Sequence, residues 1–413
     1  MSSSSQRPLI NAAYYPSWRI YRGLSPSSLQ LDCINRVLYA FVLVNEDGTL
    51  RFLDEHADFS IAADGERGCL AALTKLKQHH HGIQVLVSIG GGSGSAEFPV
   101  LASHPSRRAT FARACRQLVD RFLLDGIDID WEHPQTPYDG GNYLQLLRAL
   151  REALPAPRYV LTTALPVGEY ALRNIDLGAA AALLDNIHLM GYDFHGPWTD
   201  VCGHHAKLLP EGGGAKDEKN VYPTLRHSCH RGVRYVTSRG FPADKIVLGV
   251  PAYARSFAGA HGVGQPFRGA EEIDYAELPE EWIRGAKIDR DVVAASYVDR
   301  HGHSSNQHHN HNHNLSHNHQ DGGKKEKDKK GFVTFDVPET VRAKAEYVRC
   351  MGLGGLFFWT GAGDRKGPDS LVRAGFEALR SGDPAWRDRI AMVVAGGKPS
   401  PSLKKLVSSW IRH

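Results

Sequence analysis

The sequence of 413 residues lacks the features that mark several large classes of protein. It has no run of about 18 apolar residues, so no membrane-spanning helix is predicted. Its 42 glycines follow no G-x-y period, which excludes a collagen-like chain. None of its six cysteines forms a C-x-x-C pair, so neither a zinc site nor a thioredoxin-like redox site is indicated. Their scattered spacing is typical of free, buried thiols.

Charge and composition exclude further classes of protein. The net charge of +4 is small, and the segment 324–330 alone contributes +3, from five lysines and two acids. Because the rest is nearly neutral, no nucleic-acid-binding face is predicted. The shares of 42% apolar and 23% charged residues are typical of a globular protein. No apolar run of a signal peptide follows the N-terminus, so we expect a cytoplasmic protein or export without a leader.

Short, β-branched, largely apolar runs recur along the chain and alternate with helix-like segments such as Arg107–Leu124. Near-continuous apolar runs are typical of parallel strands buried on both faces. Eight such β-then-α units predict an α/β protein with a (β/α)8 TIM barrel, whose active site would lie at the C-terminal ends of the strands. The eight runs are Asn11–Pro16, Val37–Leu43, Gln84–Ile89, Gly126–Trp131, Tyr159–Ala164, Asn186–Tyr192, Ile246–Pro251 and Gly354–Trp359.

The interval after the seventh run is too long for a single helix. It holds two further strand-like pieces, Ala294–Val298 and Phe332–Asp336, which predict a small α+β insertion subdomain. The predicted organisation is a catalytic barrel over 8–255 and 338–381, an insertion over 256–337, and a C-terminal helical extension over 382–413.

Within the insertion, the low-complexity segment 301–330 begins with the histidine-rich tract His301–His319. Imidazoles bind zinc, copper and nickel, so a metal-buffering protein is one hypothesis. The alternative is a disordered loop grown by low-complexity expansion, and we favour it because the tract shows no fixed ligand geometry. We therefore predict no metal site and no cofactor.

The C-terminal tail carries one amphipathic helix signal. Ser400 and Pro401 are typical of an N-cap and a first helical position. The apolar stripe behind them is short and carries little charge, so we expect it to pack against the barrel rather than on a membrane. It comprises Leu403, Leu406, Val407, Trp410 and Ile411.

The fourth run contains the most informative pattern. Asp128, Asp130 and Glu132 follow one another at every second position, so they share one face of a strand. The apolar alternates, Ile127, Ile129 and Trp131, share the other face. In a parallel barrel the acidic face would point inward, with Glu132 at the open C-terminal end.

Three carboxylates this close cannot all be ionised, so at least one pKa must rise. This arrangement suits a general acid at neutral pH. A Mg²⁺ or Ca²⁺ site and a buried acidic network without catalysis are the alternatives. Asp125 has the opposite parity, so we expect it to support a loop or a strand end.

The stretch resembles the D-x-x-D-x-D-x-E signature of glycoside hydrolase family 18, the chitinases and their relatives, with matches at Asp125, Asp128, Asp130 and Glu132. The insertion is similar to the α+β domain that deepens the cleft in one branch of this family, and the resemblance covers about residues 10–380. Other segments that resemble the family are Ser88-Ile89-Gly90-Gly91, Met190-Gly191-Tyr192-Asp193, the stretch from Gly249 to Arg255, and Gly354-Gly355 followed by Trp359.

The resemblance implies substrate-assisted, retaining hydrolysis of β-1,4 bonds between N-acetylglucosamine units, an exception to the two-carboxylate scheme. It implies that Glu132 is the general acid and later the base. Asp130 would orient the substrate's acetamido group, Asp128 would share a proton with Asp130, and Tyr192 would bind the acetamido oxygen. An endo-β-N-acetylglucosaminidase acting on N-glycans and a chito-oligosaccharide-binding lectin are alternatives with the same fold.

The resemblance also implies a binding surface for chitin or chito-oligosaccharides. Charge and hydropathy predict neither a nucleic-acid nor a membrane partner, and a monomer is expected for this architecture. Trp359 is expected to form the floor under the reacting sugar, since aromatic rings stack on apolar sugar faces. Two positions depart from the family pattern: Gly92 stands where many relatives have Trp, and His133 where many have an aromatic residue. The other expected binding residues are Asp193, Met190, Tyr15, Phe41, Gly91, Trp198, Tyr253 and Arg255.

Overall fold

The computed structural model describes residues 8–80, 82–211, 223–300 and 329–395. The histidine-rich tract and the amphipathic stripe after Ser400 lie outside these residues, so their predictions stand as made.

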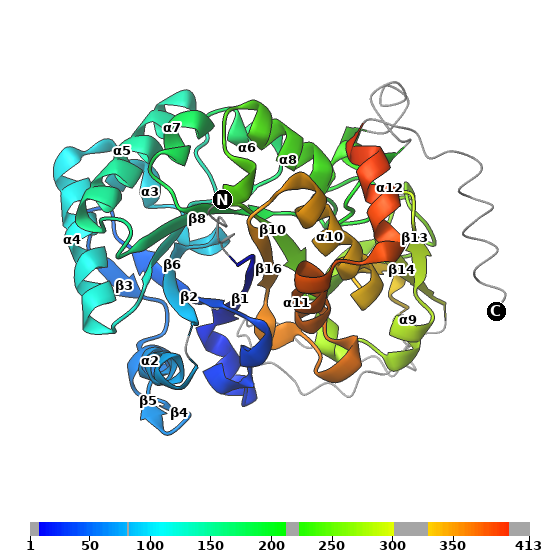
Figure 1. Cartoon of the computed structure of the whole chain (residues 1–413), viewed down its shortest axis with the longest axis horizontal. Coiled ribbons are helices and arrows are strands. Elements are labelled where there is room, and N and C mark those ends of the chain that lie inside the picture. Colours follow the sequence, from blue (N-terminus) through cyan, green and yellow to red (C-terminus); the bar gives the residue numbers. More distant parts are fainter. Residues whose placement is uncertain (1–7, 81, 212–222, 301–328, 396–413) are drawn as a thin grey trace, which may run out of the picture.

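Eight parallel strands form a closed barrel surrounded by helices (Figure 1). Each strand pairs with its neighbours in parallel, and pairing between β1 and β2 closes the ring. Every predicted run is a strand, and the predicted (β/α)8 barrel is confirmed. In order around the ring the strands are β1 (Ile10–Pro16), β2 (Arg36–Val44), β6 (Gln84–Gly90), β7 (Gly126–Asp130), β8 (Val160–Pro166), β9 (Asn186–Met190), β10 (Ile246–Pro251) and β16 (Gly355–Trp359).

Helices cover the outer face of the barrel, as the connections between parallel strands require. Helix α5 begins at a capping box, in which Thr136 accepts from the backbone of Asp139 and the Asp139 side chain accepts from the backbone of Thr136. The helices are α1 (Glu55–Phe59), α2 (Cys69–His79), α3 (Phe98–Ser103), α4 (Pro105–Arg121), α5 (Pro137–Ala153), α6 (Glu169–Leu172), α7 (Leu177–Ala181), α8 (Cys229–Ser238), α9 (Glu280–Arg284), α10 (Pro338–Met351), α11 (Leu371–Ser381) and α12 (Pro384–Val394).

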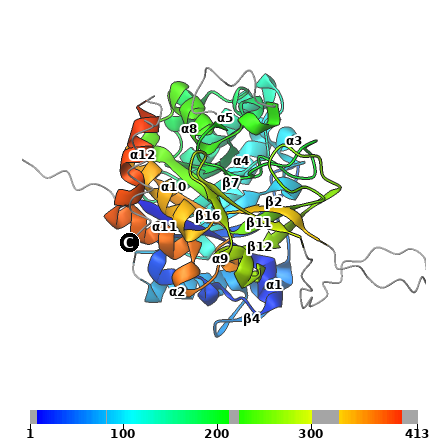
Figure 2. The ribbon, with the colours of Figure 1, turned by 90° about the vertical axis from the view of Figure 1, so that its right-hand side faces the viewer.

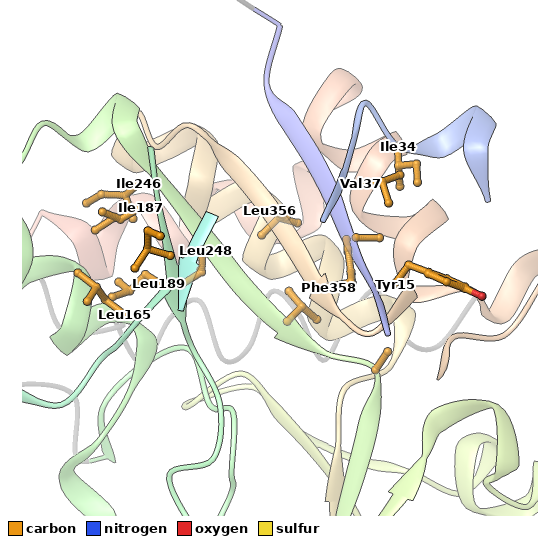
Figure 3. Packing of buried hydrophobic residues seen from close by; sticks show 14 of the residues in the cluster. Tyr15, Ile34, Val37, Leu165, Ile187, Leu189, Ile246, Leu248, Leu356 and Phe358 are labelled. Atoms are coloured by element: carbon orange, nitrogen blue, oxygen red, sulfur yellow. The ribbon is translucent and has the colours of Figure 1, made fainter. Parts of the chain in front are cut away.

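The barrel strands divide their side chains between two environments. Outward side chains, such as Ile187 and Leu189 of β9 and Leu356 of β16, pack in one continuous apolar layer under the helices (Figure 3). Inward side chains are a mixture of apolar groups, among them Tyr14 and Phe357, and the buried polar groups of the site. Burying each large apolar side chain contributes about 1.5–3 kcal/mol, so the outer layer holds the polar interior in place.

The insertion lies between β10 and β16 as an antiparallel sheet in the order β12-β11-β15-β14-β13. Figure 2 shows β11 and β12 of this sheet beside α9. Both predicted strand-like pieces are present, as β14 and β15. Strand β11 begins at Tyr253, directly after β10, so Tyr253 and Arg255 reach the barrel from the insertion sheet. The strands are β11 (Tyr253–Ala258), β12 (Gly269–Asp274), β13 (Lys287–Asp289), β14 (Ala294–Asp299) and β15 (Gly331–Phe335); outside the insertion, β3 (Leu50–Phe52) extends β2, and β4 (Ala62–Ala63) pairs with β5 (Glu66–Arg67).

Three further features follow from the described residues. All six cysteines are free, and five of them are buried, as the sequence predicted. Across the described ranges, no helix combines the length and apolarity that a membrane crossing needs. The same residues contain no group of three or more His, Cys, Asp and Glu side chains placed to hold a metal ion.

Candidate active site

The carboxylates of β7 lie inside the barrel, on the face that strand alternation predicts. Asp128 and Asp130 are buried, and Glu132 stands half-buried just beyond the C-terminal end of the strand. Ile129 and Trp131 face the helices, where Trp131 stacks on Phe98 at 5.4 Å between ring centroids. The strand therefore presents a row of acids that rises from the barrel centre to its open end.

Asp128 is the most heavily hydrogen-bonded group of the site. Its Oδ2 accepts from the Tyr14 hydroxyl and the Ser88 hydroxyl, both at 2.8 Å. Its Oδ1 accepts from the Thr162 hydroxyl at 2.6 Å and lies 3.1 Å from Nδ1 of His188. Burial raises the pKa of Asp128, but the hydrogen bonds from His188, Thr162 and Ser88 outweigh burial and hold this pKa below its usual range. Asp128 is therefore the charged member of the group.

Asp130 has the opposite environment. Its Oδ1 is buried and, among the described residues, meets no hydrogen-bond donor. Burial, followed by the negative charges of Glu132 and Asp128, raises the pKa of Asp130 well above its usual value. Asp130 is therefore the member of the pair that holds a proton more readily than Asp128, and it keeps one acceptor atom free.

Glu132 is fixed through its backbone while its carboxyl group faces the barrel mouth. Its amide donates to the Ser95 hydroxyl at 2.8 Å, and that hydroxyl donates to the carbonyl of Gly91 at 2.8 Å. Burial and then the charge of Asp193 raise the pKa of Glu132, which suits a proton donor. A Cβ placed at Gly92 would lie only 3.7 Å from Oε1 of Glu132, so residue 92 directly adjoins the acid.

Asp193, at the end of β9, is held by the insertion sheet. It accepts from the Tyr253 hydroxyl at 2.8 Å and from Nε of Arg255 at 2.9 Å. Nδ1 of His205 lies 3.7 Å from the same oxygen. Burial raises the pKa of Asp193, but His205, Arg255 and Tyr253 outweigh it and lower this pKa. Asp193 is thus a fixed negative charge that faces Glu132.

Aromatic rings line the barrel mouth opposite β7. Trp359, at the end of β16, stacks on Phe41 at 5.6 Å and meets the edge of Tyr14 at 5.3 Å. Trp18 continues the row at 6.3 Å from Phe41 and is 39% exposed. Gly91 has a φ of +84°, and a Cβ there would lie 2.7 Å from the Phe41 ring, so glycine makes room for this row.

The remaining predicted residues lie around the same opening. Tyr192 contacts Tyr253 and Phe357, each at 6.1 Å between ring centroids, and Met190 packs on the same interior cluster. Burial, followed by the charge of Asp130, raises the pKa of Tyr192, so its hydroxyl stays protonated beside the acids. Trp198 is 58% exposed, and the Arg255 guanidinium lies 5.1 Å above its ring.

The prediction that Tyr15 lines the site is wrong. Tyr15 is fully buried on the helix side of β1, where its hydroxyl donates to the carbonyl of Leu24 at 2.8 Å (Figure 3). Because side chains alternate along a strand, its neighbour Tyr14 points inward and reaches Asp128.

The sequence analysis also missed other groups of the site. Three of them are polar residues inside a buried strand, and this position was the signal that could have identified them. The other three lie in the segments that follow strand ends. The missed residues are Tyr14, Thr162, His188, Ser95, Trp18 and Tyr170.

Asp125 behaves as its parity predicts. Its carboxylate accepts from the backbone amide of Val85 at 2.7 Å and pairs with Lys77 at 2.8 Å. It therefore ties the start of β7 to β6 and takes no part in the site.

His133, which follows Glu132 in the chain, contacts Tyr170 at the start of α6. Their rings meet edge to face at 5.5 Å, and Tyr170 is 57% exposed. Partial burial and then the charge of Glu132 raise the pKa of Tyr170.

A carboxylic acid with a raised pKa at the mouth of a TIM barrel, next to a charged acid and a row of aromatic rings, defines the site of a barrel glycosidase. The chain matches the glycosyl hydrolases family 18 over residues 10–364, and it belongs to that family.

Similar proteins agree with this assignment. The chain is 31% identical over 388 residues to endochitinase 1 of Metarhizium robertsii, covering 88% of this chain and 83% of the relative. It is 30% identical over 398 residues to chitinase 1 of Aphanocladium album, covering 90% and 86%. The crystal structure of Ostrinia furnacalis group IV chitinase in complex with allosamidin is 25% identical, has a TM-score of 0.75, and covers 91% of this chain and 100% of that chain.

Proposed function

We propose that this protein is a chitinase that hydrolyses β-1,4 bonds between N-acetylglucosamine units, with retention and with the substrate's own acetamido group as nucleophile. The observation that carries the proposal is the row of Asp128, Asp130 and Glu132 along β7 and just beyond its end. Hydrogen bonds lower the pKa of Asp128, while burial raises the pKa values of Asp130 and Glu132. Relatives named as chitinases support the substrate class.

The reaction begins with proton transfer from Glu132 to the glycosidic oxygen as the bond to the anomeric carbon breaks. The acetamido oxygen attacks that carbon, and the acetamido nitrogen acquires positive charge in an oxazolinium ion. Asp130 suits this step because its free Oδ1 can accept the acetamido N–H. Its proton can pass to the neighbouring Asp128, which leaves an Asp130 anion beside the cation. Glu132, now ionised, takes a proton from water, and the water oxygen bonds to the anomeric carbon while the bond from that carbon to the acetamido oxygen breaks. The acetamido group is neutral again, and the proton returns from Asp128 to Asp130.

The other site residues position the sugar. The Tyr192 hydroxyl donates a hydrogen bond to the acetamido oxygen. Asp193, which is held by its ion pair with Arg255, binds the same sugar. Trp359 forms the floor, with Phe41 and Trp18 continuing toward the next units. We propose that the enzyme acts on chitin or soluble chito-oligosaccharides, and that it does so as a monomer.

Hydrolysis of a fluorogenic chitotriose substrate and of an N-glycopeptide, measured side by side, tests the proposal. We expect release from chitotriose and none from the glycopeptide. Cleavage of the glycopeptide alone would transfer the function to N-glycan processing. Binding of chito-oligosaccharide without turnover of either substrate would make the protein a lectin.

Tyr170→Ala is expected to weaken binding on the leaving-group side of Glu132. Tyr170 is an exposed ring beside the acid, and residue 92, which also adjoins the acid, is a glycine. An aromatic contact of about 0.5–1.5 kcal/mol corresponds to a rise of roughly 2- to 10-fold in KM. This rise is expected for chitohexaose, which extends across the site, while turnover of an aryl chitobioside stays unchanged.

Tyr138→Ala on α5 removes another exposed tyrosine, 69% exposed, and serves as the matched control. An unchanged KM for chitohexaose in Tyr170→Ala, or an equal rise in both variants, would contradict the assignment.

A further inference from the structure

His188 of β9 is a fully buried histidine in the barrel interior. Its Nδ1 lies 3.1 Å from Oδ1 of Asp128, and its Nε2 has no hydrogen-bond partner among the described residues. The ring is fixed by edge contacts with Tyr14 at 6.1 Å and Phe357 at 5.3 Å. It is the one nitrogen donor among the four groups that hold Asp128, beside three hydroxyls.

The hydrogen-bond pattern determines where the proton of His188 lies. An ionised carboxylate only accepts, so the proton of the His188–Asp128 contact belongs to Nδ1 of His188. Burial lowers the pKa of His188, and the positive charge of Arg36 lowers it further, against the opposing effect of Asp128. The imidazole is therefore neutral, and its hydrogen bond rather than a positive charge stabilises the Asp128 anion.

The charged and titratable groups around this pair come from every neighbouring element. Arg36 of β2 is buried near Asp128 and donates to the side-chain oxygen of Asn186 at 3.0 Å. Tyr14 of β1, Asp130 of β7, Tyr143 of α5 and Tyr192 after β9 complete the set that interacts with Asp128. The tyrosines stay neutral, so Asp130 is the group that competes with Asp128 for a proton.

We propose that His188 is a positioning residue that holds Asp128 as the anion through its Nδ1–H and thereby keeps the proton of the aspartate pair on Asp130. This inference deepens the proposed function and rests on it for its kinetic consequence. A resting Asp130 with a proton leaves Asp128 ready to receive that proton when positive charge develops on the substrate. Without the imidazole donor, Asp128 is protonated in the resting enzyme. It can then no longer accept a proton from Asp130 during the reaction.

His188→Leu tests the proposal by removing the donor while keeping an apolar side chain of similar size. We expect the acid limb of the pH profile of kcat for fluorogenic chitotriose to move up by about one unit, because Asp128 is then protonated more easily. We expect kcat at its optimum to fall by roughly 10-fold or more. In His188→Asn the amide N–H replaces the donor, so the acid limb is expected to return most of the way to its wild-type position.

Val247→Ala is the matched control. Val247 faces the same barrel interior, is paired in register with His188 on the neighbouring strand, and carries no polar side-chain atom. If kcat falls in His188→Leu while the acid limb of its pH profile stays where it is in the wild type, His188 has a packing role only and the proposal is overturned. The same shift of the acid limb in Val247→Ala would also overturn it.

A measurement without substrate separates this inference from the proposed function. The carboxyl carbons of Asp128 and Asp130 can be titrated by ¹³C NMR in the wild type and in His188→Leu. We expect the pKa of Asp128 to rise in the variant even if the protein cleaves no chito-oligosaccharide. Equal titration curves for Asp128 in both proteins would overturn the role of His188, whatever the activity.

Discussion

Glu132→Gln is expected to reduce kcat for chito-oligosaccharide hydrolysis by about 10²–10⁴-fold, the usual contribution of a positioned general acid. Glutamine has the same shape but no dissociable proton, so the sugar still binds while the leaving oxygen receives no proton. The measurement is turnover of fluorogenic chitotriose, with binding of unlabelled chitotriose by calorimetry expected within about threefold of the wild type.

The pH dependence supplies a second readout for Glu132. The reaction needs its protonated form, so activity is expected to fall as pH rises through the pKa of Glu132. Burial and Asp193 raise that pKa, which extends activity further toward neutral pH than an ordinary glutamate would allow. Glu169→Gln, at the exposed start of α6, is the matched control and should retain both rate and profile. A Glu132→Gln variant with more than a tenth of wild-type kcat would contradict the role of Glu132 as the acid.

Asp130→Asn is expected to reduce kcat by a similar factor but at a different step. Asparagine cannot become the anion that stabilises the oxazolinium ion. Its NH₂ group is also a donor, where the substrate's acetamido N–H needs an acceptor. An aryl leaving group that departs without a proton should therefore restore much of the rate in Glu132→Gln and little of it in Asp130→Asn. Comparing chitobiosides with nitrophenyl and alkyl leaving groups measures this difference.

Asp125→Asn is the control for Asp130→Asn. Asp125 precedes the opposite end of β7, where it holds Val85 and Lys77, so its loss should lower thermal stability and leave kcat within about threefold. Equal sensitivity of Glu132→Gln and Asp130→Asn to the leaving group would contradict the separate roles assigned to the two acids.

Strand alternation explains why much of the site could be predicted from the sequence. In β7 the acids and the apolar residues alternate without interruption, so the inward face was evident. The same rule applied to β1 would have selected Tyr14 in place of Tyr15. Trp359 was evident because it ends an apolar strand.

Other parts of the site depend on information that a single strand does not carry. Phe41 faces inward because the pairing register shifts after Tyr39, which alternation alone does not predict. Thr162 is the register partner of Asp128, whereas His188 pairs with Ala164, two residues further along β8, so the two donors reach Asp128 from different register positions. These contacts follow from the register of the whole barrel rather than from any local pattern.

The most direct test of the account is the dependence of hydrolysis on the N-acetyl group. Wild-type protein should be compared on chitotetraose and on its fully de-N-acetylated counterpart, with product anomers followed by ¹H NMR. The account predicts hydrolysis of chitotetraose with the β-anomer formed first, and no measurable hydrolysis of the amine-bearing substrate. Comparable rates on both substrates, or initial formation of the α-anomer, would contradict catalysis by the acetamido group.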